Sequence, residues 1–284
     1  MIRHRSYAVP LTAVLLALAT GVALGAGPLH SASSDASPGP RVVTRPEVPG
    51  YADAFAAGVA RQLYDHGLSR RPVALVTMPG ADPATVSALT AQVRAAGGQV
   101  TATYAVRGQL VDPQQKSLVD TLGIQLDKQL RQGTVPGAST YPRIGQLVAI
   151  AVANRGTAGA PAGADAAAVR QSLAAAGLLD VPSGAPQTAP LVLVVLGSPV
   201  VQPIADGVLA GLGAGARGVV AVAPTRDQTL AGLRTDGIAQ RVTLVDGSET
   251  SAGRVAAVLA LVRAWTRPGG SFGASGADGA VPLG

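Results

Sequence analysis

Short, continuous runs of apolar residues recur along the chain and alternate with segments whose apolar positions have helical spacing. These runs predict strands at Val73–Met78, Leu191–Leu196, Gly218–Ala223 and Val242–Val245, and an alternating segment predicts one more at Val100–Val106. Strands without alternation are typical of a parallel sheet that helices cover on both faces. We therefore expect an α/β domain with a mainly parallel, Rossmann- or flavodoxin-like sheet of about five strands.

Helices are predicted between and after these strands. Asp82 is a good N-cap with Pro83 at the first helical position, and Gly97-Gly98 ends that helix. Helical spacing also predicts helices at residues 112–130, 143–154, 165–176, 203–212 and 251–265. The helices before Leu191 form a helical insertion between the second and third strands.

An uncharged run, Ala8–Gly27, precedes the folded part. Its length of about 20 residues can cross a bilayer as a helix. Arg3 and Arg5 precede the run and no positive charge follows until Arg41, which predicts a single-pass anchor with its domain outside the cytoplasm. The small-residue triplet Ala23–Gly25 leaves a cleaved signal segment and a secreted or outer-membrane protein as alternatives. All of these interpretations place the domain in the cell envelope or beyond it.

Changes in amino-acid composition along the chain divide it into four parts. Residues 1–27 are the anchor or signal segment, and residues 28–50 read as a linker because Pro and Ser dominate them. Residues 51–267 form the exported α/β domain. Residues 268–284 are a Gly-rich tail, which we expect to be disordered.

The charge and cysteine content limit the partners. The formal net charge is +6 and the chain has no cysteine, which excludes disulfides and thiolate metal sites. The arginines are scattered and aromatic residues are scarce, so we expect no nucleic-acid partner. Solvated surface charge explains the arginines most simply. A membrane surface with anionic headgroups, envelope proteins or envelope polymers are the alternative partners.

Catalytic motifs give no positive signal. The spacing of Gly213, Gly215 and Gly218 fits GxGxxG, but a helix precedes it and a strand follows, which reverses the context of a dinucleotide site. His66 is the one histidine of the predicted domain, and no nucleophile elbow or phosphate loop accompanies it. We therefore expect no enzyme, with a degenerate α/β enzyme as an alternative.

Metal ligands are equally sparse. His66 and Met78 are the weak candidates for a metal site, since copper takes imidazole and thioether ligands. His66 reads more readily as a residue at a helix end, and Met78 as core packing. We expect no cofactor from the residues themselves.

The carboxyl ends of the predicted strands carry the polar residues that a binding site would use. Ligands of open α/β sheets bind in the crevice at this edge. A crevice for a small anionic or polar ligand would be formed by Asp82, Ser198, Arg226, Asp227 and Asp246. The simpler interpretation gives these residues capping and turn roles.

Several segments resemble the actinobacterial MctB (mycobacterial copper transport protein) family. They are residues 17–25 in the N-terminal segment, 72–83 (PVALVTMPGADP), 96–101 (AGGQVT) and the Gly-rich ending at 270–278. Together these segments span nearly the whole chain. The resemblance implies copper homeostasis and a channel-like role in the envelope, with a copper ion as a ligand on this ground alone.

The resemblance carries over no catalytic residues. Relatives in corynebacteria are linked to cell separation, which makes a membrane-anchored scaffold in division an alternative function. Family members typically place a coiled coil where this chain has its Pro/Ser linker, although oligomerisation stays possible. Short strands separated by helices, together with a single anchor, do not suit a simple pore. The sequence therefore predicts that copper is handled through partners or oligomers.

Overall fold

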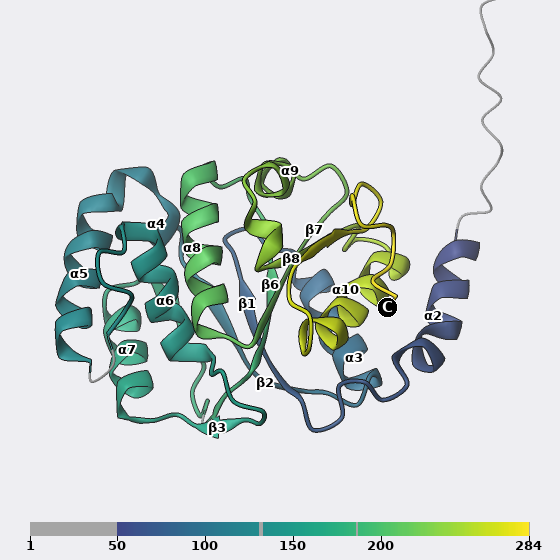
Figure 1. The fold of residues 1–284 in the computed structure, drawn as a ribbon, viewed down its shortest axis with the longest axis horizontal. Helices are drawn as coiled ribbons and strands as arrows, with labels where there is room; N and C mark the ends of the chain where they lie inside the picture. Colours follow the sequence, from purple (N-terminus) through teal and green to yellow (C-terminus); the bar gives the residue numbers. More distant parts are fainter. Residues whose placement is uncertain (1–49, 131–132, 186, 284) are drawn as a thin grey trace, which may run out of the picture. The chain divides into compact units, whose positions relative to one another are not determined.

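Seven strands form the main sheet in the computed structural model, which describes residues 50–130, 133–185 and 187–283 (Figure 1). Their order is β4-β2-β1-β6-β7-β8-β9, and every neighbouring pair is parallel except β2 with β4. The strands are β1 Pro72–Thr77, β2 Gln99–Val106, β4 Leu179–Asp180, β6 Leu191–Val195, β7 Gly218–Ala223, β8 Thr243–Asp246 and β9 Gly270–Phe272. The predicted mixed α/β fold with a mostly parallel sheet is confirmed, and the sheet is wider than expected.

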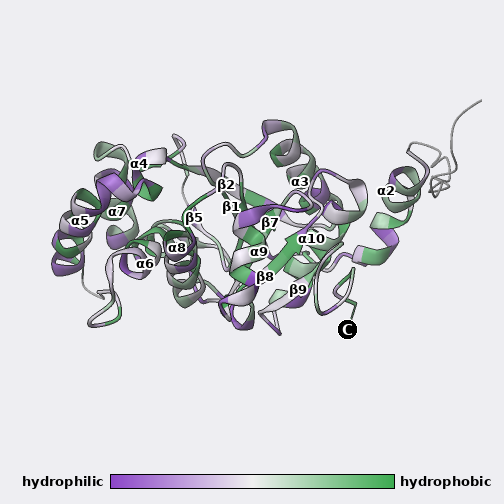
Figure 2. Ribbon diagram, turned by 90° about the horizontal axis from the view of Figure 1, so that it is seen from above, coloured by the Kyte–Doolittle hydropathy of each residue, from purple (hydrophilic) through white to green (hydrophobic). Residues whose placement is uncertain are grey.

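The central strands are buried because helices cover both faces of the sheet. The core on one face takes side chains from α4 Gly108–Val111, α5 Lys116–Gln129, α6 Thr140–Val152, α7 Ala164–Ala175, α8 Gln202–Gly215 and α9 Gln228–Thr235. The core on the other face takes side chains from α2 Tyr51–Tyr64, α3 Pro83–Ala95 and α10 Ser251–Ala264. Ala74 and Val76 of β1 point to the first face, whereas Val73 and Leu75 point to the second. Figure 2 shows the strands as a hydrophobic centre between these layers.

The expected helical insertion lies between β2 and β6. It contains α4 to α7, the 3-10 turn η1 Pro113–Gln115, and a two-stranded sheet of β3 Ala160–Pro161 with β5 Gln187–Thr188. Arg170 of α7 is buried and fastens this insertion. Its guanidinium donates hydrogen bonds to the carbonyls of Ala151 (2.7 Å), Gln187 (3.0 Å) and Ala185.

Helices α6 and α8 touch through their backbones. A Cβ added at Gly145 would overlap the carbonyl oxygen of Val208, and one added at Gly211 would overlap the carbonyl oxygen of Pro142. Real Cβ atoms do not approach so closely, so only glycine fits at these two positions. The chain passes from the end of α8 directly into β7, so Gly213, Gly215 and Gly218 lie at a helix-to-strand connection, as predicted.

The expectation of a disordered tail at residues 268–284 is wrong for the segment that follows α10. Gly270–Phe272 forms β9 and pairs in parallel with β8, and the Phe272 side chain is buried. The backbone N–H of Ser271 donates to the Asp278 carboxylate at 2.7 Å. The tail is ordered because β8 offers it backbone hydrogen bonds and Asp246 accepts hydrogen bonds from Ser275. The composition of the tail does not reveal these partners.

The predicted anchor at residues 1–27 and the linker up to residue 49 lie outside the described residues. Among the residues that the structure describes, no helix combines the length and the apolar character that crossing a membrane requires.

Candidate functional site

The carboxyl edge of the sheet brings two of the predicted loops into contact. The N–H of Ser198, after β6, donates to the carbonyl of Pro79, after β1, at 2.7 Å. Gly80 has a φ of 75°, and a Cβ there would overlap the Ser198 hydroxyl. The loops of Ser198 and Asp82 are therefore packed directly on one another.

Asp82 uses its carboxylate to cap α3. Its oxygens accept hydrogen bonds from the Thr85 hydroxyl (2.7 Å) and from the N–H groups of Thr85 (2.9 Å) and Ala84 (3.2 Å). These bonds from Thr85 and Ala84 hold the pKa of Asp82 below its usual value. The geometry supports the capping interpretation of this residue.

Asp227 and Arg226 lie in the loop between β7 and α9. The Asp227 carboxylate caps α9 by accepting from the N–H of Leu230 at 2.8 Å. Arg226 is exposed and has a left-handed φ of 66°. The loop is tied to the start of α10 by Glu249, a residue that the sequence analysis missed, whose two carboxylate oxygens lie 3.1 Å from the Thr225 nitrogen.

Asp246, at the end of β8, is buried beneath the tail. Its carboxylate accepts hydrogen bonds from the backbone N–H and hydroxyl of Ser275, and Arg234 of α9 lies 3.3 Å away. Burial raises the pKa of Asp246, but the hydrogen bonds from Ser275 and Arg234 outweigh it, so the pKa lies below its usual value. Asp246 thus holds the tail and does not line an open rim.

The two candidate copper ligands are not brought together. His66 is exposed in the turn between α2 and β1, with a left-handed φ of 53°. Met78 follows the other end of β1 and is 3% exposed in the core beside α8. Among the described residues, no three His, Asp or Glu side chains are grouped so that they could share a metal ion.

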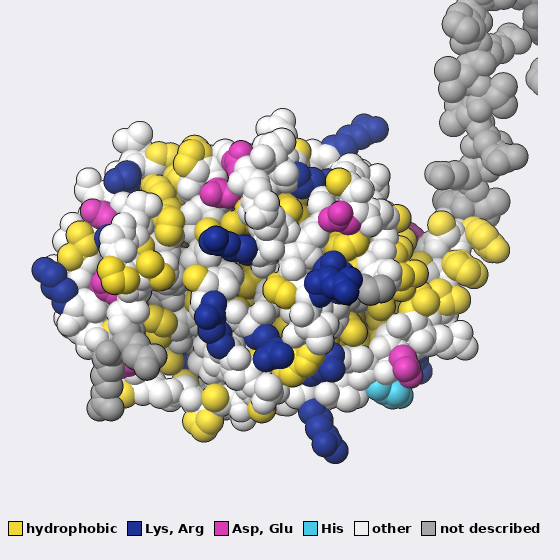
Figure 3. Space-filling model, in the orientation of Figure 1, with side chains coloured by type: hydrophobic (Ala, Val, Ile, Leu, Met, Phe, Trp, Pro, Cys, Tyr) yellow, Lys and Arg dark blue, Asp and Glu magenta, His cyan; other side chains and the backbone are white. Residues whose placement is uncertain are grey.

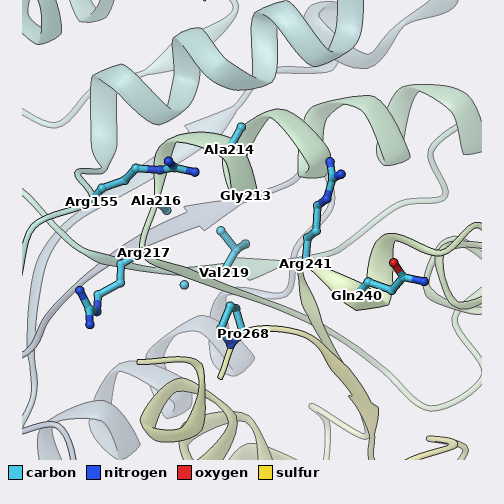
Figure 4. Close-up of a pocket in the computed structure, with 10 residues that line it drawn as sticks. Arg155, Gly213, Ala214, Ala216, Arg217, Val219, Gln240, Arg241 and Pro268 are labelled. Atoms are coloured by element: carbon cyan, nitrogen blue, oxygen red, sulfur yellow. The ribbon is translucent and has the colours of Figure 1, made fainter. Parts of the chain in front are cut away.

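Open hollows lie at the opposite edge of the sheet, where the parallel strands begin. One of about 470 Å³ is lined by Arg155, Arg217 and Arg241, with Gln240 and Pro268 beside them (Figure 4). Arg155 follows α6, whereas Arg217 and Arg241 precede β7 and β8. None of the five predicted crevice residues lines this hollow.

The sequence did contain a signal for this arginine-lined edge. Arg71, Arg217 and Arg241 each stand within two residues of the first residue of a predicted strand. Because parallel strands begin at one edge of a sheet, arginines in these positions converge there. The predicted crevice uses only the carboxyl ends of the strands and therefore lies at the other edge of the sheet.

The fold and these surfaces define an α/β domain whose described residues hold arginine-lined hollows and no clustered metal ligands. The model of the MctB family, described as copper transport outer membrane protein, matches residues 1–282. The chain therefore belongs to the MctB family, and the resemblance seen in the sequence is confirmed. The match supports a location in the cell envelope and a role related to copper transport or homeostasis. No curated protein matches the chain.

Proposed function

We propose that this protein acts in copper homeostasis in the envelope through partners or through further copies of itself. The observation that carries the proposal is the family match, which extends over residues 1–282. The described domain is a helix-covered sheet, so copper movement is assigned to the assembly that the domain joins. A membrane-anchored scaffold in cell separation is the alternative that a test must distinguish.

The donor set supports an indirect role for the described domain. Copper(I) prefers thiolate and thioether ligands, and the chain has no cysteine. Met78 is enclosed in the core, and His66 is separated from it by the length of β1. A tight copper site from these two side chains would require β1 to leave the sheet.

Calorimetry on the purified full-length protein in detergent tests this part of the proposal. We expect no submicromolar binding of copper(I) or copper(II). Submicromolar binding that disappears in the His66→Ala/Met78→Leu variant would contradict the ligand argument.

Deletion of the gene separates the two functions. The proposal expects altered copper tolerance or copper accumulation, restored by the wild-type gene. Unchanged copper handling with chains of unseparated cells would favour the division scaffold instead.

The topology is part of the same proposal. An anchor at residues 1–27 with the domain outside the cytoplasm fits the family's place in the envelope and the charges of Arg3 and Arg5. Protease added to spheroplasts should digest the domain and spare the N-terminus. A domain that resists digestion until lysis would contradict this topology.

We also propose that the protein is not an enzyme. The carboxylates of Asp82 and Asp227 are engaged in helix caps, and that of Asp246 holds the tail. A hydrolase and nucleotide screen should show no turnover. Activity that is lost in Asp82→Asn or Asp246→Asn, with the fold retained, would overturn this proposal.

A further inference from the structure

Arginines from distant parts of the chain gather at the edge where the parallel strands begin. We call this set the arginine edge, and its members are Arg71, Arg155, Arg217, Arg241, Arg263 and Arg267. They precede β1, β7 and β8 or follow α6 and α10, and Arg263 lies in the last turn of α10. Figure 3 shows Lys and Arg side chains gathered on one part of the surface in view, with most acidic side chains outside the group.

The arginine edge borders several hollows that share lining residues. Five hollows of about 280 to 550 Å³ belong to this set. Arg71 lines the first and second, and Arg263 lines the second and third. Gln240 lines the third and fourth, and Arg155 lines the fourth and fifth. A chain-like ligand could therefore lie along this edge and meet a guanidinium in successive hollows.

The charges of the arginine edge are not neutralised within the described part of the chain. The ion pairs there join Arg107 to Asp180, Arg143 to Asp120 and Arg234 to Asp246, and none includes a member of the edge. Asp165 and Asp278 line two of the hollows, but neither lies within ion-pair distance of these arginines. An anion bound here would meet cations that have no internal carboxylate partner.

Two of these cations are held close together. The guanidinium carbons of Arg71 and Arg217 lie 4.7 Å and 4.4 Å from the centroid of the Trp265 ring. The Nε of Arg217 donates to the Trp265 carbonyl at 3.0 Å, which leaves its two terminal nitrogens available. Burial, and then the charge of Arg217, lower the pKa of Arg71 below its usual value. An anion placed beside Trp265 would relieve this repulsion.

We propose that the arginine edge binds a linear anionic polymer of the cell envelope, with phosphate or carboxylate groups seated in successive hollows. Guanidinium groups pair with both kinds of anion through two parallel hydrogen bonds. This inference is independent of copper, because it assigns a binding surface and not a metal site.

The shape of the edge favours a polymer over a flat anionic bilayer. Guanidinium groups that line hollows reach a chain that enters them, whereas a bilayer surface meets protruding side chains. Surfaces that dock on membranes also combine basic residues with a broad exposed apolar face. At the arginine edge, the large exposed apolar residues that line hollows are Val135 and Leu283, in two different hollows.

Binding of linear polyphosphate to the full-length protein in detergent tests the proposal. Long polyphosphate should bind at least about tenfold more tightly than tripolyphosphate at equal phosphate concentration, because it occupies several hollows at once. Arg155→Gln and Arg241→Gln should each weaken binding roughly three- to tenfold, and each should lower the slope of log affinity against log salt by about one.

The controls separate this surface from general charge attraction and from a membrane. Lys116→Gln removes one exposed charge at the start of α5, outside the five hollows, and should leave binding unchanged. An equal effect of Lys116→Gln, or equal affinity for short and long polyphosphate, would overturn the proposal. So would absent polyphosphate binding together with binding to anionic phospholipid vesicles that Arg155→Gln/Arg241→Gln abolishes.

Discussion

Ser275 donates its backbone N–H to the buried carboxylate of Asp246, with 3.1 Å between the nitrogen and the nearer oxygen. Arg234 lies 3.3 Å from the same carboxylate. One side chain at the end of β8 thus joins the sheet, α9 and the segment that follows β9. The carboxylate is satisfied only while Ser275 and Arg234 stay in place, so it couples the tail to the domain.

Asp246→Asn should lower the free energy of unfolding by about 1–3 kcal/mol, because the amide cannot accept both sets of hydrogen bonds. Limited proteolysis should also cut the segment around Ser275 sooner. Asp65→Asn, at an exposed turn residue whose left-handed φ of 42° suits asparagine, is the matched control. It should change stability by less than about 0.5 kcal/mol. Equal effects of the two substitutions would show that Asp246 does not hold the tail.

Acid should remove the stabilisation that Asp246 provides. The folded-state pKa of this carboxyl group is lowered, so its contribution is fully present above the unfolded value of about 3.9 and is lost as the pH falls through the folded pKa. Denaturant unfolding between pH 6 and acid pH, compared for the wild type and Asp246→Asn, measures this effect. The difference between the two proteins should shrink as the pH falls, and a constant difference would contradict the assignment.

The backbone contact of α6 with α8 predicts an asymmetry between glycines. Gly145→Ala should destabilise the protein by about 1–3 kcal/mol, because its Cβ would overlap the carbonyl oxygen of Val208. Gly58→Ala in α2 meets nothing within 4 Å and should be neutral or stabilising by up to about 1 kcal/mol. Thermal unfolding of both variants measures the difference, and similar melting temperatures would mean that the two helices can separate at low cost.

Arg170 should contribute more to stability than an exposed arginine. Arg170→Leu leaves the carbonyls of Ala151, Ala185 and Gln187 without this donor and should cost about 3 kcal/mol. Arg61→Leu, at an exposed position of α2, should stay within about 0.5 kcal/mol of the wild type in the same denaturant titration. A cost for Arg170→Leu as small as that of the control would show that water replaces the lost donor.

The sequence predicts the central strands well because strands that are buried on both faces consist of apolar residues throughout. Leu191–Val195 and Gly218–Ala223 are apolar throughout, and both are buried strands within a residue of the predicted bounds. Leu118, Leu122, Leu126 and Leu130 have the spacing of an inward-facing stripe on the helix predicted at residues 112–130, and this prediction is less accurate. Leu118 is 47% exposed whereas Val119 and Gly123 are buried, because the approach of α6 and not the leucine spacing decides which side of α5 faces inward.

The order of the tail depends on contacts between distant residues, so local composition could not reveal it. Gly270–Phe272 looks flexible in sequence, yet it forms β9 on the free edge of β8. Among the predicted crevice residues, Asp82 caps the helix that the sequence predicted, whereas Asp227 caps α9, for which no helix was predicted. The burial of Asp246 follows from Arg234 and Ser275, which local pattern cannot place beside it.

Copper tolerance of a deletion strain that carries the His66→Ala/Met78→Leu variant distinguishes copper handling through partners from direct binding by these side chains. Strains that carry the wild-type gene or an empty vector provide the two reference values, and immunoblots confirm equal protein levels. We expect the variant to restore tolerance as fully as the wild type, because partners and not these side chains handle the metal. A folded variant at normal abundance that fails to restore tolerance would contradict it.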